Sequence, residues 1–156
     1  MKKIIIYGGK KLHGSISVSG SKNSSLSILA SSMLFEKKVV LKNIPMVEDI
    51  KTMIKLLIYL GKNIKIKKKT IEINNSKKFG KSFIAPYELV KTMRAGILVL
   101  GPLISKFKKA KVSLPGGCAI GARPIDLHLK FLKSIGVRNH IAVSYTHLTL
   151  PTMYTV

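Results

Sequence analysis

Acidic residues, arginine and tryptophan are scarce or absent in this chain. Its 156 residues include 28 Lys and Arg but six Asp and Glu, which gives a formal charge of +22 at pH 7. Such a surplus attracts polyanions. However, only Arg94, Arg123 and Arg138 are arginines, and lysine with abundant Ile and Asn is typical of AT-rich coding sequence. Aromatic residues make up 6%, so few side chains could stack on bases. Nucleic-acid binding is therefore the weaker alternative.

Cysteine and long apolar runs are also rare. The single cysteine, Cys118, excludes an internal disulfide and a multi-cysteine metal site, and it fits a reducing compartment. The apolar run near the start is interrupted by Gly8 and Gly9 and is too short for a signal peptide core. No stretch reaches the roughly 18 apolar residues of a membrane span. We expect a soluble, cytoplasmic protein.

The remaining sequence predicts alternating helices and strands. Hydrophobic residues make up 46% of the chain, enough for the core of one ordinary domain. Period-two patterns predict strands over residues 15–20, 37–45 and 110–115 and a strand pair over 62–74. Helical spacing predicts helices over residues 21–35, 47–61, 86–107 and 124–136. This order favours an α/β or α+β fold in which helices cover sheets.

The element order contains a repeat. A shift of 73 places the strand residues Val39 and Leu41 on Val112 and Leu114, and a shift of about 71 pairs Asn23 with Arg94. A shift of 75 matches the following helices, placing Ile50, Ile54, Leu57, Leu60 and Gly61 on Ile125, Leu129, Leu132, Ile135 and Gly136. The repeated core is structural. The second strand-to-helix connection is two residues longer, so the difference between the copies is where function is expected.

That longer connection is the glycine loop "PGGCAIGARPIDLH", residues 115–128. Its glycines let backbone N–H groups approach an anion, and the next helix offers its positive N-terminal end. Arg123 beside it can grip a carboxylate or phosphate through two hydrogen bonds. A thiol at Cys118 would feel this positive charge, which lowers its pKa and favours a nucleophile or proton donor. The alternative is an inert, small buried cysteine.

Two further places carry candidate groups. In "SGSKNSS", residues 19–25, Lys22 and Asn23 stand at a strand-to-helix turn that suits an anionic ligand. Plain helix capping by Ser21 or Asn23 beside a solvated lysine is the alternative. Arg94 lies in an apolar helical segment and needs an anionic or carbonyl partner, for which Glu88 is a simple structural candidate.

Three segments carry a resemblance to a known family. "SGSKN", "APYELVKTMRAGILVLGPLISKF" and "VSLPGGCAIGARPIDLHLKFLKSIGV" resemble the N-terminal part of the UDP-N-acetylglucosamine 1-carboxyvinyltransferases, from about Ile4 to Val137. The resemblance implies transfer of the enolpyruvyl group of phosphoenolpyruvate to the 3'-hydroxyl of UDP-N-acetylglucosamine, the step that opens peptidoglycan synthesis. It implies these two small-molecule substrates and no cofactor or metal. A shikimate-type enolpyruvyl transferase shares the fold, but the cysteine loop argues against it.

The resemblance also assigns roles to residues. Cys118 is expected to act as the general acid toward the methylene carbon of phosphoenolpyruvate and to form a covalent adduct there. Lys22 matches the lysine that binds phosphoenolpyruvate, and Asn23 stands beside it in the motif. Arg94 matches an arginine that contacts the nucleotide sugar. The family segment that holds the uridine end of the nucleotide sugar matches Arg123, Pro124, Ile125, Asp126 and Leu127. Within it, Arg123 is expected to serve both substrates.

Finally, the resemblance implies an incomplete protein. The implied fold is an inside-out α/β barrel of two domains, each built from repeated βαβαββ units, of which only part of the first domain is present. Residues 1–21 are expected to belong to the second domain and residues 22–141 to the first. Residues 142–156, which include "SYTHLTLPTMYTV", resemble translated adapter sequence and are expected to be a non-native tail. The chain alone is therefore predicted to be inactive.

Overall fold

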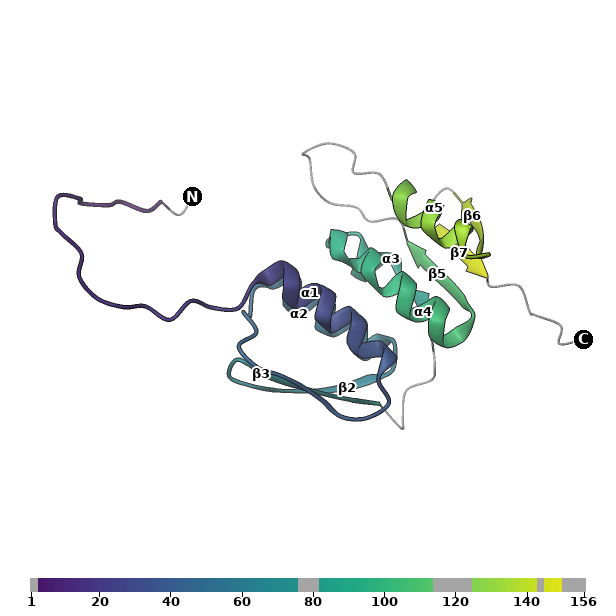
Figure 1. Cartoon of the computed structure of the whole chain (residues 1–156), viewed down its shortest axis with the longest axis horizontal. Helices are drawn as coiled ribbons and strands as arrows, with labels where there is room; N and C mark the ends of the chain where they lie inside the picture. The colour runs from purple at the N-terminus through teal and green to yellow at the C-terminus, as the bar shows by residue number, and fades with distance from the viewer. Residues whose placement is uncertain (1–2, 76–81, 114–124, 143–144, 150–156) are drawn as a thin grey trace, which may run out of the picture.

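A computed structural model of the chain describes residues 3–75, 82–113, 125–142 and 145–149 (Figure 1). Helices and strands alternate along these residues. In chain order they are α1 (Lys22–Ser31), the 3-10 helix η1 (Ser32–Leu34), β1 (Val39–Leu41), α2 (Glu48–Tyr59), β2 (Lys62–Lys67), β3 (Thr70–Asn75), β4 (Ile84–Ala85), α3 (Tyr87–Val90), the 3-10 helix η2 (Arg94–Val99), α4 (Leu100–Phe107), β5 (Lys109–Ser113), α5 (Asp126–Ser134), β6 (Arg138–Ala142) and β7 (Tyr145–Thr149).

The strands form two sheets with a shared pattern. The first sheet has the order β1-β3-β2, with both outer strands antiparallel to β3. The second has the order β4-β5-β7-β6, with β4 parallel to β5 and β7 antiparallel to both of its neighbours. The strands β1, β2 and β3 follow α1–η1 and pair in the order β1-β3-β2. The strands β5, β6 and β7 follow η2–α4 and pair in the matching order β5-β7-β6. The repeat predicted from the sequence is thus present in the topology of the described residues.

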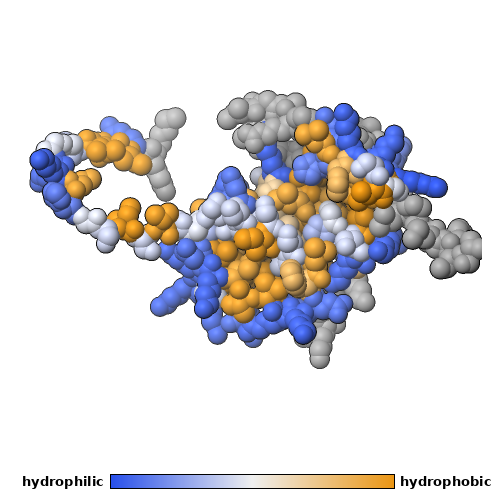
Figure 2. Space-filling view, viewed as in Figure 1, coloured by the Kyte–Doolittle hydropathy of each residue, from blue (hydrophilic) through white to orange (hydrophobic). Residues whose placement is uncertain are grey.

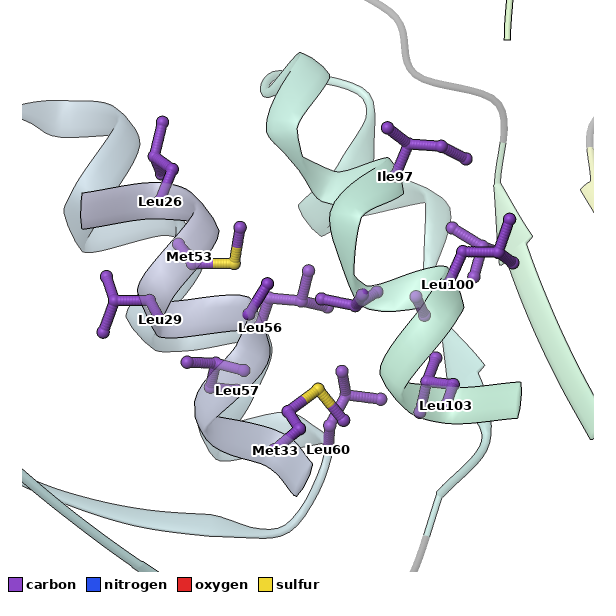
Figure 3. Packing of buried hydrophobic residues seen from close by; sticks show 14 of the residues in the cluster. Leu26, Leu29, Met33, Met53, Leu56, Leu57, Leu60, Ile97, Leu100 and Leu103 are labelled. Carbon is purple, nitrogen blue, oxygen red and sulfur yellow. The ribbon is translucent and has the colours of Figure 1, made fainter. Parts of the chain in front are cut away.

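The core lies among helices that run between the sheets. In Figure 1, α1 and the η2–α4 run lie side by side, and both point their N-terminal ends toward the same side of the molecule. Figure 3 shows Leu56 and Leu57 of α2 beside these helices, and Met53, Leu56 and Leu57 have no exposed surface. Burial of leucine-sized side chains contributes about 1.5–3 kcal/mol each. The fold therefore fixes the starts of α1 and η2 relative to each other through apolar packing.

One predicted helix is wrong in its extent. Residues 86–107 do not form a single helix but are divided into α3, η2 and α4, because Met93 has an extended backbone with φ −140° and ψ 113°. Pro102 explains part of the division, since proline interrupts a helix interior but is tolerated in the first turn of α4. Gly96 allows η2 to approach α3 closely, because a Cβ there would lie 2.9 Å from Cγ1 of Val90. The division places Arg94 at the start of a helical segment.

The N-terminal segment forms no strand. Residues 15–20 were expected to be a strand, but the described residues 3–20 have no regular secondary structure, and Ile4, Ile16 and Val18 are at least 78% exposed. Figure 2 shows these apolar residues on a segment that stands clear of the body. A strand with no neighbouring strand lacks the hydrogen bonds that would define it, which accounts for the difference.

The C-terminal residues join the second sheet. The expected domain boundary at residue 141 falls inside β6, and β7 lies within residues 142–156, which the sequence assigns to a non-native tail. β7 pairs with both β5 and β6 through backbone groups. Such pairing depends on backbone atoms and on β-favouring residues such as Tyr and Thr, so it does not decide the origin of this segment. The non-native tail stays a prediction.

Lys62 is the buried charge of the first unit. Its Nζ donates to the carbonyl oxygen of Phe35 and to Oδ1 of Asn75, both at 2.9 Å, and the residue is 4% exposed. Burial, together with the nearby positive charge of Lys106, lowers the pKa of Lys62 to about 8, and the smaller effect of Glu36 opposes this shift. The repeat shift of 75 places Lys62 on Val137, which is buried and apolar.

Candidate active site

The first part of the site is the N-terminus of α1. The side chain of Ser21 caps the helix by accepting a hydrogen bond from the backbone N–H of Ser24 at 3.4 Å, so capping belongs to Ser21 rather than Asn23. The first turn contains no acidic residue. Lys22 and Asn23 are the first two residues of the helix and are exposed. An exposed ammonium beside a positive helix end can receive an anion.

Lys22 is held by a residue from another helix. Its Nζ lies 2.8 Å from Oδ2 of Asp49, in the first turn of α2, and their side chains are 48% and 40% exposed. An ammonium has three N–H donors, of which Asp49 takes one. Lys22 is thus oriented and still open to solvent. Asp49 is not among the residues that the sequence analysis singles out, because nothing in its spacing identifies the pair.

Close backbone packing explains why these two side chains meet. A Cβ at Gly20 would lie 2.0 Å from the carbonyl oxygen of Asn43, so only glycine permits this approach. Asn43 has a left-handed backbone, with φ 58°, and the next N–H, of Ile44, donates to the carbonyl oxygen of Lys69 at 2.9 Å. The segment before α1 and the segment before α2 are therefore packed together, and Lys22 and Asp49 follow directly from them.

Arg94 takes the equivalent place in the second unit. It is the first residue of η2 and is partly buried, and η2 contacts α1. Glu88, considered from the sequence as its partner, bonds to Lys91, and this hydrogen bond is the main cause that raises the pKa of Lys91. Arg94 and Asn23, paired by the repeat, thus stand at the starts of two neighbouring helical segments.

The third part of the site is the start of α5. Ile125 precedes the helix and packs partly buried against the core, whereas Leu127 is 71% exposed. Asp126 is the first helical residue and is exposed. Predicted site residues Cys118, Arg123 and Pro124 lie outside the described residues. Ser113, the last residue of β5, is fully buried and directly precedes that segment.

The described residues show neither a metal-binding cluster nor a membrane-spanning helix. In that part of the chain, His, Cys, Asp and Glu side chains nowhere gather in a group of three or more that could hold a metal ion. None of its helices is both long and apolar enough to cross a membrane. Lys22 at the start of α1 and Arg94 at the start of η2 offer positive groups, which suits a ligand that carries phosphate or carboxylate.

Comparisons with known proteins agree with the motifs. Residues 6–152 match the sequence model of the family described as EPSP synthase (3-phosphoshikimate 1-carboxyvinyltransferase). The chain is 57% identical over 151 residues to the UDP-N-acetylglucosamine 1-carboxyvinyltransferase of Pelagibacter ubique, covering 97% of the chain and 36% of that relative. It is 55% identical over 138 residues to the protein of the same name from Lawsonia intracellularis, covering 88% of the chain and 32% of that relative.

A solved structure supports the architecture. The crystal structure of the enolpyruvyl transferase NikO from Streptomyces tendae matches 92% of the chain and 31% of its own chain, with a TM-score of 0.74 and 20% sequence identity. This likeness shows the fold, in which the chain forms part of a larger α/β architecture. The chain spans about a third of the length of the curated relatives it matches.

Proposed function

Because this chain belongs to the EPSP synthase (3-phosphoshikimate 1-carboxyvinyltransferase) family, we propose that it is the N-terminal third of an enolpyruvyl transferase acting on UDP-N-acetylglucosamine. The observation that carries the proposal is the 57% identity to a UDP-N-acetylglucosamine 1-carboxyvinyltransferase over 97% of the chain. The whole enzyme would move the enolpyruvyl group of phosphoenolpyruvate to the 3'-hydroxyl of the sugar and release phosphate. It would act in the cytoplasm at the start of peptidoglycan synthesis and thereby serve cell shape and division.

The proposed chemistry needs a proton donor and positive charge. Cys118 protonates the methylene carbon of phosphoenolpyruvate while the sugar hydroxyl adds to the neighbouring carbon. Loss of a proton from the methyl group and departure of phosphate then restore the double bond. General acid catalysis of this kind typically contributes about 10²–10⁴-fold. The glycine loop would let the thiol approach and would cover it when closed.

The binding roles follow the same proposal. Lys22 and Arg123 hold the phosphate and offset its charge as it leaves, and Asn23 lies beside Lys22. Arg94 contacts the nucleotide sugar. The uridine end is held by the segment that begins at Arg123 and continues through Pro124, Ile125, Asp126 and Leu127. The position of Lys22 and Asn23 at an acid-free helix start supports this assignment.

The domain assignment is also part of the proposal. Residues 1–21 would complete a sheet of the second domain, and residues 22–141 would form an incomplete first domain. The exposed apolar residues of the N-terminal segment support this, because they have no partner among the described residues. Residues 142–156 would be a non-native tail.

A basic nucleic-acid-binding fragment is the competing function from another class. Its support is the charge of +22. It would require binding to single or double strands that survives Cys118→Ser and weakens steeply with salt. A shikimate-type transferase would instead require activity on shikimate 3-phosphate.

Growth rescue tests the proposal. Reading the source DNA beyond the codon for Val143 should give a frame that continues to about three times the present length, and we call its product the full-length protein. The full-length protein should restore growth to bacteria depleted of their own UDP-N-acetylglucosamine 1-carboxyvinyltransferase, and the 156-residue chain should not. A frame that ends at Val156, or a full-length protein that restores no growth, would refute the proposal.

A further inference from the structure

We propose that Asp49 is a positioning residue for the phosphate-binding ammonium of Lys22. The inference rests on the proposed function, which gives Lys22 its ligand, but Asp49 has no role in the motif that identified Lys22. Its warrant is the 2.8 Å contact between Nζ of Lys22 and Oδ2 of Asp49, which joins α1 to α2 across 27 residues of sequence.

The scaffold, rather than the side chains, brings the two groups together. Gly20 lies against the carbonyl oxygen of Asn43. Gly20 is two residues before Lys22, and Asn43 is six residues before Asp49. The helices α1 and α2 are in contact, and Leu26, Leu29 and Met53 belong to the same buried cluster (Figure 3). Because both helix starts are fixed, the carboxylate occupies one place relative to the lysine backbone. A four-carbon side chain that loses this contact returns to many rotamers.

The charges of the pair suit a positioning role. Asp49 accepts one of the three N–H donors of Lys22 and leaves the others for a ligand oxygen. The 48% exposure of the Lys22 side chain lets an anion reach it. A pair this exposed contributes little to folding stability. Its loss should therefore disturb the place of the ammonium much more than the fold.

The adjacent acid provides a matched control. Glu48 lies in the same first turn of α2, its side chain is 75% exposed, and it pairs locally with Lys51 at 3.3 Å, three residues along the helix. Removing either carboxylate takes one negative charge from the same helix end. Only removal of Asp49 frees Lys22.

The experiment measures steady-state kinetics in the full-length protein. Asp49→Ala should raise KM for phosphoenolpyruvate about tenfold, because a misplaced binding group weakens ligand contact, while KM for UDP-N-acetylglucosamine and Tm stay near wild type. Asp49→Asn keeps an oxygen that accepts from Lys22 and should recover most of the loss. Glu48→Ala should match wild type. An unchanged KM for phosphoenolpyruvate in Asp49→Ala, or an equal rise in Glu48→Ala, would overturn the role.

A second measurement does not depend on activity. The rate at which acetic anhydride labels Lys22, followed by peptide mass spectrometry, should rise in Asp49→Ala and not in Glu48→Ala, because the contact with Asp49 restricts the approach of the anhydride to Nζ of Lys22. Equal labelling rates in wild type and Asp49→Ala would overturn the positioning role. If the wild-type protein transfers no enolpyruvyl group, the proposed function fails and the labelling rate alone decides whether Asp49 holds Lys22.

Discussion

The first unit, from α1 to β3, and the second, from η2 to β7, share a topology and differ in the connection between their first strand and second helix. In the first unit this connection is short and held in place, with Asn43 against Gly20 and Ile44 bonded to Lys69. In the second it is the longer glycine loop that contains Cys118 and Arg123. The comparison indicates that the repeated elements supply fixed positions, whereas the thiol predicted to react lies in the connection that differs between the two units.

The helices that follow these connections differ in burial. Leu56 of α2 has no exposed surface, while Phe131, its counterpart at a shift of 75, is 63% exposed. The helices α1 and η2–α4 cover α2 (Figure 3). Among the described residues, nothing equivalent covers the face of α5 that carries Leu127, Phe131 and Ile135. The helix α2 is therefore buried within the core, whereas α5 leaves one apolar face exposed.

The largest effect should come from the loop. In the full-length protein, Cys118→Ser should lower kcat/KM for enolpyruvyl transfer about 10²–10⁴-fold, because a hydroxyl is a far weaker acid than the thiol, with little change in Tm. Lys42→Ala makes a change in the shorter connection of the first unit and should leave the rate near wild type. Transfer by Cys118→Ser at the wild-type rate would remove the functional difference between the two connections.

The next largest effect should be on stability, at Leu56 of α2 and at its counterpart Phe131 of α5. In the 156-residue chain, Leu56→Ala should lower the free energy of unfolding by about 2–5 kcal/mol, because it leaves a cavity in a fully buried site. Phe131→Ala should change it by about 0.5 kcal/mol or less, because the ring is mostly in solvent. Urea denaturation followed by circular dichroism measures both. Equal losses would mean that α5 is packed as α2 is, contrary to the structure.

The smallest effect is a change in pH dependence. The pKa of Lys62 is lowered to about 8 in the folded chain from 10.5, so between these values the unfolded chain keeps a proton that the folded chain releases. This group therefore makes stability rise as pH increases from about 8 to about 10.5, and the gain is lost as pH falls again. Lys62→Met removes this contribution, and unfolding midpoints of both proteins across the range measure the difference. Identical slopes would contradict the lowered pKa.

Much of the fold could be predicted from the sequence because local patterns were strong. The helices α1, α2 and α5 carry apolar residues at helical spacing, and the hairpin β2–β3 alternates. The break at Met93 could not be predicted, since the apolar periodicity continues across it and the close approach of Gly96 to Val90 is seen only in the structure. The prediction of a strand over residues 15–20 was wrong for another reason, because a strand needs a neighbouring strand that the local sequence does not supply.

The candidate site was predictable in part. Lys22 and Asn23 were identified by their motif, and their position at a helix start is confirmed. Asp49 was missed because its contact with Lys22 joins residues that are 27 positions apart, and local spacing does not encode such a contact. The roles of Cys118 and Arg123 stay predictions, since both lie outside the described residues.

The most direct test measures phosphate release from phosphoenolpyruvate by the purified full-length protein, with each of two acceptors. The account predicts release that depends on UDP-N-acetylglucosamine and is absent with shikimate 3-phosphate. It also predicts no release by the 156-residue chain with either acceptor. Release that requires shikimate 3-phosphate, or no release with either acceptor by a folded full-length protein, would contradict the account.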